Sequence, residues 1–597
     1  MKKISYSSLA WLVSCLMLVI AACWYPKWVK PGPEVTISWD VSGYYWYLPT
    51  YLIYQDPQEM AFRDSILEKY SPSWGFYQAY PYEGHYVMKY SMGLALQYLP
   101  AFAAGHIWAL CSDYPADGFS LPYQVAIHWG SLLVAFLGLW LLRGNLRRYF
   151  RDEVAALVIL LIGIGTNYFN YASVDAALTH NYLFTLYALL IWLSIRWHEK
   201  PDRRYALGIG LVVGLAALTR PTDIIAGLIP LLWGWDGWRA RLALLRRRWP
   251  DLGIAALAAL AVGALQLMYW KSVTGEWVVY SYQEQGFSFL NPHVVDVFFS
   301  YKKGWLVYTP LMAFSIGGLL FLWRRKALFW VVFLFFLLNT WVVSSWDVWW
   351  YGGSFGQRAM VQSYALLAFP MAALVEAGWK RWWSRVLLLP AFAFGIALNL
   401  FQTWQAHLGG LDPENMNKAY YWRIFFNTDV TKEDQLLMDS GVMPFRNRRL
   451  GETVFFRDFE TPGPDSVQVS RDTAFSGSYS LKIEPLSRSV FYSFPFSAGE
   501  NNADGVHLSA RFFGYKKEWD MWKMGQLHVA FVRSGQTIYD NQVRVPRVME
   551  SRHWVLVGAD FRFPGTEFDE VRVYFDNLSE VKTVYIDDLK VELVSGK

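Results

Sequence analysis

An aspartate among aromatic residues is the first side chain in this sequence whose type and position point to chemistry. Asp40 stands in the segment 38–45, soon after an apolar stretch that ends at Trp24. A carboxylate in such a place can take the proton of an acceptor hydroxyl while that oxygen forms a new bond, which is general base catalysis. The alternative is an ordinary solvated loop carboxylate or a helix cap. Spacing alone does not separate the two interpretations.

Two arginines in otherwise apolar surroundings form the second group of candidates. Arg220 lies between the apolar stretches 206–218 and 224–235, and Arg358 ends the sequence WDVWWYGGSFGQR. A cation near a membrane core is costly without an anion, and glycines let backbone N–H groups approach phosphate oxygens. We expect both arginines to bind a phosphate. The alternatives are Asp223 as a structural partner of Arg220, and an Arg358 that only reaches toward water from a helix start.

Three more polar residues are candidates for contacts with a sugar or a phosphate. Lys89 can reach a phosphate at a membrane interface, although lysines are common there. His180 lies on a short turn between two apolar stretches. Glu83 lies in the same polar loop as Asp40 and can supply a second acid.

Long apolar runs must position these residues. The chain has 597 residues, of which 54% are hydrophobic and 18% aromatic, and aromatic rings concentrate at membrane interfaces. The net charge of +5 is small, and the basic residues lie in short clusters between apolar runs, so nothing points to a nucleic-acid partner. The three cysteines form no CxxC pair, so neither a disulfide framework nor a zinc site is supported.

The apolar runs predict a polytopic α-helical membrane protein with about eleven spans. The candidate spans are 9–24, 121–142, 154–169, 183–195, 206–218, 224–235, 253–270, 306–323, 327–346, 359–375 and 386–401.

Basic clusters near the ends of the spans set the expected orientation, because Lys and Arg favour the cytoplasmic side. With Lys2, Lys3 and all later basic clusters inside, the loop 25–89 and the C-terminus are external. This topology requires that the segment 91–110, broken by Pro100, does not cross fully. In the alternative, 91–110 is a span and the two short stretches around Arg220 join into one, which leaves two basic clusters outside.

Beyond residue 401 the pattern changes from long apolar runs to short alternating segments. We expect a linker over 402–450 and an all-β sandwich over 451–597, since several short strands separated by Gly, Pro, Asn and Asp are typical of antiparallel sandwiches. The predicted strands are 453–459, 478–483, 506–513, 526–532, 554–561, 571–575 and 583–593.

Several landmarks over residues 1–400 together resemble one family. They are the segments 89–93 with 99–100, 165–167 with 179–181, 218–221, 304–310 and 346–358. In them the chain is similar to the GT-C superfamily of polytopic membrane glycosyltransferases. The resemblance implies a polyprenyl-phosphate-sugar donor, an external active site in the bacterial inner membrane, inversion at the sugar, and Asp40 as the catalytic acid of the first external loop.

The resemblance also bears on metals. Some members of the superfamily use two acids and a divalent metal, often in an Asp-x-Asp pattern, but Asp40 has no acidic neighbour at that spacing. An active-site metal is therefore left open, with Glu83 as the distant second acid. The C-terminal segment resembles jelly-roll carbohydrate-binding modules through residues 458–460, 476–481 and 585–589. Such modules often hold a structural calcium, here between Glu460 and Asp588, and two solvated carboxylates are the alternative.

The expected function is transfer of a sugar to a glycan, lipid or protein acceptor of the cell envelope, with membrane lipids as surroundings. A transporter or flippase for a lipid-linked glycan is one alternative, although no internal repeat is apparent. A scaffold for envelope assembly that catalyses no reaction is another. The sequence does not disclose the sugar, the acceptor or the oligomeric state.

Overall fold

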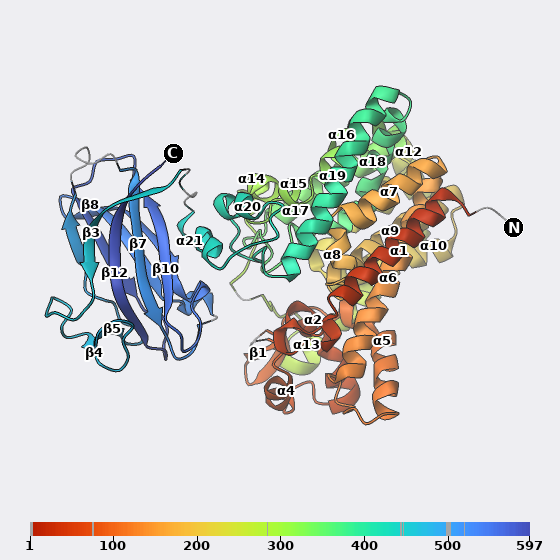
Figure 1. Cartoon of the computed structure of the whole chain (residues 1–597). Coiled ribbons are helices and arrows are strands. Elements are labelled where there is room, and N and C mark those ends of the chain that lie inside the picture. Colours follow the sequence, from red (N-terminus) through yellow and green to blue (C-terminus); the bar gives the residue numbers. More distant parts are fainter. Residues whose placement is uncertain are drawn as a thin grey trace. The chain divides into compact units, whose positions relative to one another are not determined.

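The chain folds into two compact units, Met1–Gly409 and Gly410–Lys597. The computed structural model describes residues 4–73, 77–282, 284–441, 445, 447–496, 503–518 and 520–596, so Lys2 and Lys3 lie outside the described residues. Figure 1 shows a helical first unit and a second unit built mainly of strands. The unit boundary differs from the expected linker, because α19 (Trp382–His407) continues past residue 401 and residues 410–450 group with the sandwich.

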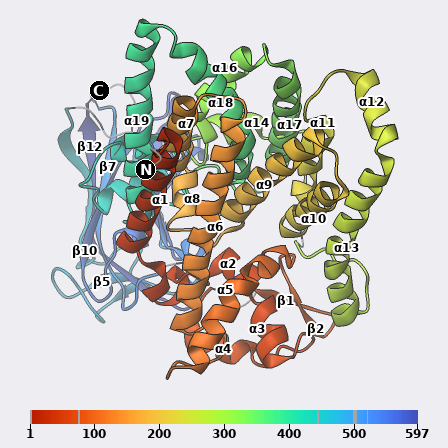
Figure 2. The same cartoon turned by 90° about the vertical axis from the view of Figure 1, so that its right-hand side faces the viewer.

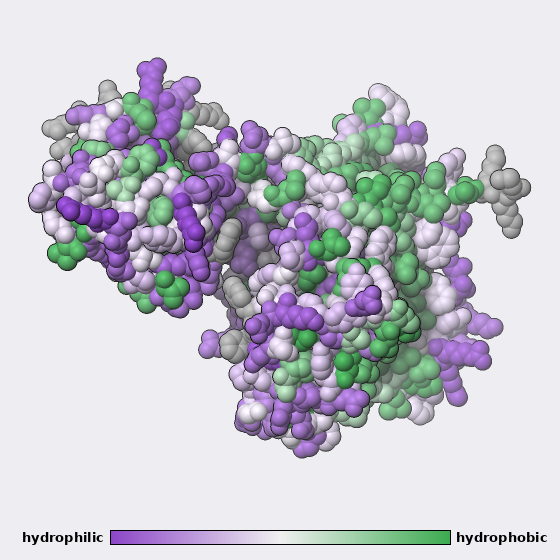
Figure 3. Space-filling model, turned by 60° about the horizontal axis from the view of Figure 1, so that its bottom comes forward, coloured by the Kyte–Doolittle hydropathy of each residue, from purple (hydrophilic) through white to green (hydrophobic). Residues whose placement is uncertain are grey.

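Six helices of the described part are long and apolar enough to cross a membrane. On the face drawn in Figure 3, apolar side chains gather over the helical unit, as expected for a surface that meets lipid. The protein is an integral membrane protein. The six candidate spans are Tyr6–Val29, which includes α1 (Tyr6–Trp24), α6 (Leu121–Arg147), α13 (Trp249–Thr274), α17 (Lys326–Ser344), Arg358–Gly378, which joins η5 (Arg358–Ser363) to α18 (Tyr364–Gly378), and α19.

The expected count of about eleven spans is not confirmed, because several predicted spans are short or broken. The apolar run 306–323 divides at Thr309–Pro310 into α15 (Trp305–Tyr308) and α16 (Met312–Leu322), since a proline has no N–H to donate and restricts the residue before it. The run 154–169 also divides, after Gly165, and 224–235 divides after Gly227, in neither case at a proline. The pieces are α7 (Asp152–Gly165), α8 (Tyr168–Ala172), η4 (Pro221–Gly227) and α11 (Leu228–Leu232).

The other helices of this unit complete the bundle. Two of them, α9 and α10, carry candidate site residues at or just beyond one end. The segment 91–110 forms one helix, α5, in spite of Pro100, but it is not among the six candidate spans. The bounds are α5 (Gly93–Leu110), α9 (Thr179–Glu199), α10 (Arg203–Thr219), α12 (Trp238–Arg247) and α14 (Val294–Phe299).

The loop 25–89 folds into short elements that pack around a separate aromatic core. Buried residues of this core include Tyr45, Trp46 and Tyr98. The elements are η1 (Lys27–Val29), η2 (Gly32–Glu34), α2 (Trp39–Tyr45), α3 (Tyr47–Pro49), η3 (Thr50–Tyr54), α4 (Arg63–Tyr70), β1 (Ala79–Tyr82) and β2 (His85–Met88).

The second unit confirms the predicted all-β fold. One sheet has the strand order β10-β7-β12-β5-β4 with β3 also paired to β12, and the other has the order β6-β11-β8-β9. The pairings between these strands in the described part of the chain are antiparallel. The strands are β3 (Arg449–Arg457), β4 (Val469–Ser470), β5 (Ser480–Ile483), β6 (Tyr492–Pro495), β7 (Gly505–Phe513), β8 (Gln526–Arg533), β9 (Gln536–Arg544), β10 (Val555–Arg562), β11 (Glu570–Asp576) and β12 (Val584–Ser595).

Short helices lie before and between the strands. They are α20 (Lys418–Ile424), η6 (Glu433–Leu436), α21 (Leu437–Ser440), η7 (Met521–Lys523) and η8 (Val545–Arg547). Asp439 of α21 is bonded to Arg544 and Arg547, which lie at the end of β9 and in η8. These bonds explain why part of the expected linker belongs to the sandwich.

The two carboxylates of the expected calcium site have protein donors. Glu460 Oε1 accepts hydrogen bonds from the backbone N–H groups of Ser478 and Tyr479, each at 2.8 Å. Asp588 Oδ1 accepts one from the Ser476 hydroxyl at 2.9 Å. Both carboxylates therefore fasten the segment 476–479, and the calcium stays a prediction.

Candidate active site

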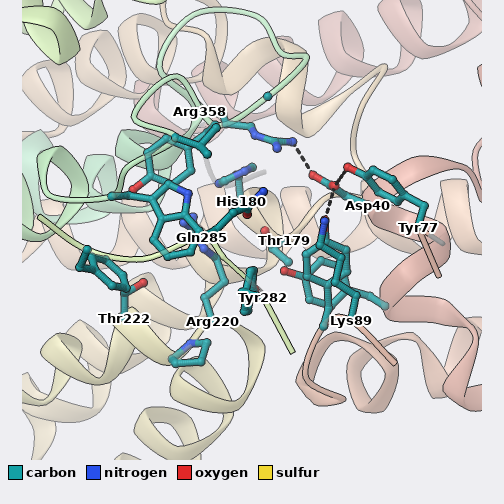
Figure 4. A pocket seen from close by; sticks show the side chains of 18 of the residues that line it. Asp40, Tyr77, Lys89, Thr179, His180, Arg220, Thr222, Tyr282, Gln285 and Arg358 are labelled. Carbon is teal, nitrogen blue, oxygen red and sulfur yellow. Dashed lines mark hydrogen bonds and ion pairs between the residues drawn. The ribbon is translucent and has the colours of Figure 1, made fainter. Parts of the chain in front are cut away.

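A cavity of about 260 Å³ in the helical unit brings most of the candidate residues together. Asp40, Lys89, His180, Arg220 and Arg358 all line it, although they come from five separate parts of the chain. Figure 4 shows their side chains directed toward one space.

Asp40 is the carboxylate of this pocket, and three side chains hold it. Its Oδ1 atom accepts hydrogen bonds from the hydroxyls of Tyr77 at 2.5 Å and Tyr90 at 2.7 Å. Its Oδ2 atom lies 2.7 Å from Arg358 Nη1. Gly43 permits this arrangement, because a Cβ atom there would lie 2.6 Å from the Tyr90 ring.

The Asp40 carboxyl is held in its charged form. Burial acts to raise its pKa, but Arg358 and the hydroxyls of Tyr77 and Tyr90 outweigh burial and lower the pKa to about 2. The backbone beside it is strained, since Trp39 has a φ of 45°, which a bulky side chain rarely adopts. Such strain is typical of functional sites. Here the strained conformation of Trp39 helps to set the direction of the neighbouring Asp40 side chain.

Arg358 is placed by a loop that is anchored to the helical bundle. Tyr351, Gly352 and Gly356 in this loop all have positive φ angles of 55° to 67°, and glycine tolerates such angles best. The Tyr171 hydroxyl binds both the N–H and the carbonyl of Phe355, at 2.9 and 3.0 Å. The chain then turns into η5, and Arg358 at its start points to Asp40 (Figure 4).

Arg220 has donor capacity that the protein does not use. It follows the last residue of α10, and its Nη1 atom is buried without a hydrogen-bond partner. No ion pair within 4 Å joins it to Asp223, although the structure describes both residues; Asp223 instead accepts from the Tyr187 hydroxyl at 2.8 Å. The Tyr351 ring lies 5.4 Å from the guanidinium. A buried unpaired donor costs free energy unless something binds to it.

Lys89 and His180 complete the polar wall. The Lys89 ammonium lies 4.9 Å from the centre of the Tyr77 ring and 5.5 Å from that of Tyr90. Burial lowers the pKa of Lys89, and the Asp40 carboxylate acts against that shift. His180, in the first turn of α9, is 3% exposed, with Nδ1 at 3.5 Å from Gln362 Oε1.

Glu83 does not join this group, contrary to expectation. It lies exposed in the turn between β1 and β2, with a φ of 47°, and it does not line the cavity. Glu83 was a candidate because it lies in the same polar loop as Asp40, but the hairpin of β1 and β2 holds it outside the pocket. Within the described ranges no three His, Cys, Asp or Glu side chains lie close enough together to hold a metal ion. We therefore derive no step through a metal.

Aromatic residues of a long loop close another side of the pocket. Tyr282, Gln285 and Phe287 line it from the segment after α13, together with Trp346. Asp347 fixes this segment, because its carboxylate accepts from the Gly286 N–H at 3.1 Å and from the Ser288 hydroxyl at 2.6 Å. Asp347 thus has a structural role that its position beside Trp346 did not reveal.

Sequence reasoning missed the tyrosines that hold the carboxylate. Tyr77, Tyr90 and Tyr44 all line the pocket, and the Tyr44 and Tyr90 rings stack with centroids 4.4 Å apart. The only signal was the position of Tyr90 directly after Lys89. With so many tyrosines in the chain, their types alone select none of them.

Comparison with known proteins places these features in a class. A family model described as dolichyl-phosphate-mannose-protein mannosyltransferase matches residues 122–269, a minority of the chain that includes His180 and Arg220. No curated protein matches the chain. The match and the helical fold confirm the resemblance of the membrane part to polytopic glycosyltransferases of the GT-C type.

Solved structures resemble both units at low identity. The Archaeoglobus fulgidus oligosaccharyltransferase is 14% identical over 73% of this chain and 60% of its own, with a TM-score of 0.40. Arabinosyltransferase EmbB from Mycobacterium smegmatis is 12% identical over 98% of this chain and 64% of its own, with a TM-score of 0.38. The chain therefore spans less than two thirds of either protein.

The sandwich is similar to carbohydrate-binding modules. The CBM22-1 xylan-binding domain from Paenibacillus barcinonensis is 14% identical and covers 25% of this chain and 97% of its own, with a TM-score of 0.18. The strand order and antiparallel pairing of the C-terminal unit, described above, carry the assignment of a sandwich by themselves.

Proposed function

We propose that this protein is a membrane glycosyltransferase that takes a sugar from a polyprenyl-phosphate-linked donor and transfers it to an envelope acceptor on the external face of the membrane. The observation that supports this most is the pocket in which one charged carboxylate, Asp40, faces two arginines and a lysine. An enzyme that transfers sugar to a hydroxyl needs a base for that hydroxyl and cations for the departing phosphate.

Asp40 has the role of general base in this proposal. The acceptor oxygen attacks the anomeric carbon of the donor, its proton passes to an Asp40 oxygen, and the bond from that carbon to the phosphate oxygen breaks. Attack from the side opposite to the phosphate inverts the sugar. Negative charge grows on the phosphate as the bond breaks, so cations at that point stabilise the transition state more than the bound donor.

Arg220 is the primary phosphate ligand in this proposal, because its buried Nη1 atom has no hydrogen-bond partner among the described residues. Lys89, whose ammonium lies over the rings of Tyr77 and Tyr90, supports it from the wall that carries Asp40. A charge-assisted bond to phosphate satisfies such donors better than a neutral acceptor does.

Arg358 links donor binding to the activity of the base. Without donor it neutralises Asp40 and keeps the pKa of that carboxyl about 2, which is low for a general base. A bound phosphate competes for the guanidinium, so the pKa of Asp40 rises as the donor enters. Asp40 then becomes a competent base only when there is a sugar to transfer.

The expected orientation follows from the same proposal. The cavity is lined in part by residues of the folded loop 25–89. With the basic clusters on the cytoplasmic side, this loop lies outside the cell. The N-terminus is then cytoplasmic and the sandwich external. The acceptor is a glycan, lipid or protein with a free hydroxyl.

A transfer assay tests the proposal. The chain is purified in detergent, incubated with a panel of polyprenyl-phosphate sugars and assayed for transfer and hydrolysis, with Asp40→Asn as the test variant. We expect Asp40→Asn to lower the rate at least about a hundredfold, while Glu68→Gln, an exposed acid of the same loop, leaves it unchanged. Undiminished transfer by Asp40→Asn would remove the base assignment. No transfer or hydrolysis with any donor would favour the transporter or the scaffold.

A further inference from the structure

A second cavity in the helical unit has no part in the proposed chemistry. It measures about 320 Å³ and lies among the first turns of α10 and α13, the end of α11, and Leu245 of α12. The Asp40 pocket is at the other ends of α10 and α13, where Arg220 and the segment after Thr274 contribute to its wall. A helix of the 26 residues of α13 is about 39 Å long. The two cavities therefore lie toward opposite ends of α10 and α13, two helices that run side by side (Figure 2).

The walls of this second cavity suit hydrocarbon rather than water. They are mainly alanine, glycine and branched aliphatic residues such as Ile209, Val213 and Leu252. The one acid among them, Asp251, is 6% exposed and accepts a hydrogen bond from the Trp197 indole at 3.1 Å. A water molecule needs two to four polar partners to stay in a cavity, and a dry apolar cavity of about 150 Å³ already admits benzene. This larger cavity has room for part of an acyl chain.

The helix beside the cavity is built for the surface of a bilayer. In and next to α12, Trp238, Leu242 and Trp249 are 69%, 50% and 70% exposed. Exposed arginines stand on the same short helix, among them Arg246 and Arg247, which directly follow the cavity residue Leu245. Exposed aromatic and aliphatic residues combined with Arg are typical of helices that lie in the headgroup region and attract anionic lipids.

A buried cation close to the cavity also has N–H donors that no described residue satisfies. Arg241 is 3% exposed, and its Nη2 atom donates to the Trp233 carbonyl at 2.8 Å. Its Nε and Nη1 atoms are buried without hydrogen-bond partners, and the nearest carboxylate, that of Asp236, is 3.9 Å away. Arg241 lies one helical turn before Leu245 of the cavity wall. An anionic group at this point would satisfy donors that the protein leaves unpaired.

We propose that this cavity is a binding site for one anionic phospholipid of the bilayer. One acyl chain occupies the apolar cavity, and the phosphate headgroup lies against α12, where Arg241 and the exposed arginines meet it. The site is independent of the Asp40 pocket, so its occupant is a resident lipid and neither the sugar donor nor the product. The lipid fastens α12 to α10 and α13 at the ends of these two helices that lie away from the Asp40 pocket.

Native mass spectrometry of the purified full chain tests this site. The protein is stripped of lipid in detergent and titrated with phosphatidylglycerol or with phosphatidylcholine of the same chain lengths. We expect one phosphatidylglycerol molecule to be retained about tenfold better than phosphatidylcholine, because of the arginines. Equal retention of the two lipids would overturn the proposal. So would loss of bound phosphatidylglycerol on addition of polyprenyl phosphate, which would assign the cavity to the donor.

Matched variants locate the bound lipid. Ala256 lines the cavity from an exposed position on α13, whereas Ala261 is exposed on the same helix and does not line it. We expect Ala256→Trp to abolish retention and Ala261→Trp to leave it unchanged. Equal effects of the two substitutions would place the lipid elsewhere.

A second pair of variants tests the headgroup and does not alter the cavity. The double variant Arg246→Gln and Arg247→Gln should remove most of the preference for phosphatidylglycerol. The double variant Arg324→Gln and Lys326→Gln, which changes exposed cations of another basic cluster, should keep it. If Ala256→Trp fails to fold, this surface pair decides the question, and an unchanged preference in Arg246→Gln and Arg247→Gln would overturn the proposal.

Discussion

Arg358 Nη1 lies 2.7 Å from Asp40 Oδ2, and this ion pair joins the start of η5 to the first turn of α2. Each side chain is 13% exposed, so the pair is shielded from water and salt. Breaking such a pair without replacing one partner leaves a charge uncompensated. A phosphate that engages Arg358 supplies the replacement. The geometry therefore predicts that base activation and donor binding are coupled.

Replacing Arg358 by glutamine should shift the pH dependence of transfer. Arg358 is the largest influence that lowers the pKa of Asp40, so its loss raises that pKa toward its ordinary value. We expect the acid limb of kcat/KM, which reports the free enzyme, to move to higher pH, together with a lower maximal rate. A profile with the wild-type acid limb would contradict the assignment of Asp40 as the titrating base.

Arg220→Gln should behave differently, because the ion-pair partner of Asp40 is Arg358, whereas Arg220 has a donor that no described residue satisfies. The loss of one charged hydrogen bond to phosphate should raise the KM for the donor roughly tenfold to a hundredfold. The acid limb of kcat/KM should remain where it is in the wild type. Donor titrations at several pH values measure both effects. A shift of the acid limb as large as that of Arg358→Gln would show that the two arginines do not have separate roles.

Tyr90→Phe tests the hydroxyl contacts of Asp40 while it preserves the ring that stacks on Tyr44. A hydrogen bond to the charged carboxylate lowers its pKa, so loss of this bond raises the pKa by roughly half to one unit. We expect the acid limb of the rate profile to rise by the same amount. Tyr86→Phe is the control, since that ring lies under Arg63 and outside the pocket. Equal profiles for the two variants would argue against the contact.

The lowered pKa of Asp40 also makes folding stability depend on pH. A fall from 3.8 to about 2 contributes about 2 kcal/mol to the free energy of unfolding at neutral pH. Because the folded-state pKa is depressed, this stability is present above pH 4 and is lost as the pH falls toward 2.

The measurement for this effect is thermal unfolding in detergent, followed by tryptophan fluorescence between pH 6 and pH 2. Asp40→Asn should flatten the dependence in that window but not abolish it. Asp175 should maintain part of the pH dependence in that variant. Burial acts to raise the pKa of Asp175, but Lys27, at 2.8 Å, helps to lower it. An unchanged slope in Asp40→Asn would contradict a depressed pKa at this residue.

The sequence predicted those parts of the fold that rest on periodicity. Each of the seven segments expected to be strands overlaps a strand of the sandwich, because alternation of buried and exposed residues is a local property. Two short strands were missed: β4, which has two residues, and β6, which has four. The strand β9 was also missed, since its first half, including Ile538 and Tyr539, is exposed. Patterns of burial do not reveal a strand that buries little.

The pocket was predictable only where a residue type is costly in its surroundings. Arg220 and Arg358 stood out because membrane segments avoid cations. Tyr77 did not stand out, since nothing in its neighbourhood marks its hydroxyl as a partner of Asp40. Glu83 was expected as a distant second acid in the same loop as Asp40, but its place in the turn between β1 and β2 keeps it out of the pocket. Convergence in space depends on long-range packing, which no local pattern contains.

Asp347 offers a last test, on the loop that closes the pocket. Its carboxylate holds Gly286 and Ser288, and thereby the neighbouring wall residues Gln285 and Phe287. Asp347→Ala removes both hydrogen bonds, so this wall is no longer ordered before substrate binds. The free energy needed to order it on binding then weakens the affinity for substrate. We expect a KM for sugar donor or acceptor raised by roughly tenfold, with the pH profile unchanged because Asp40 keeps its own partners. Glu276→Ala, a substitution in the same loop outside the wall, is the control. A shifted acid limb in Asp347→Ala would mean that the loop acts on Asp40 directly, and an unchanged KM would mean that this wall does not contact substrate.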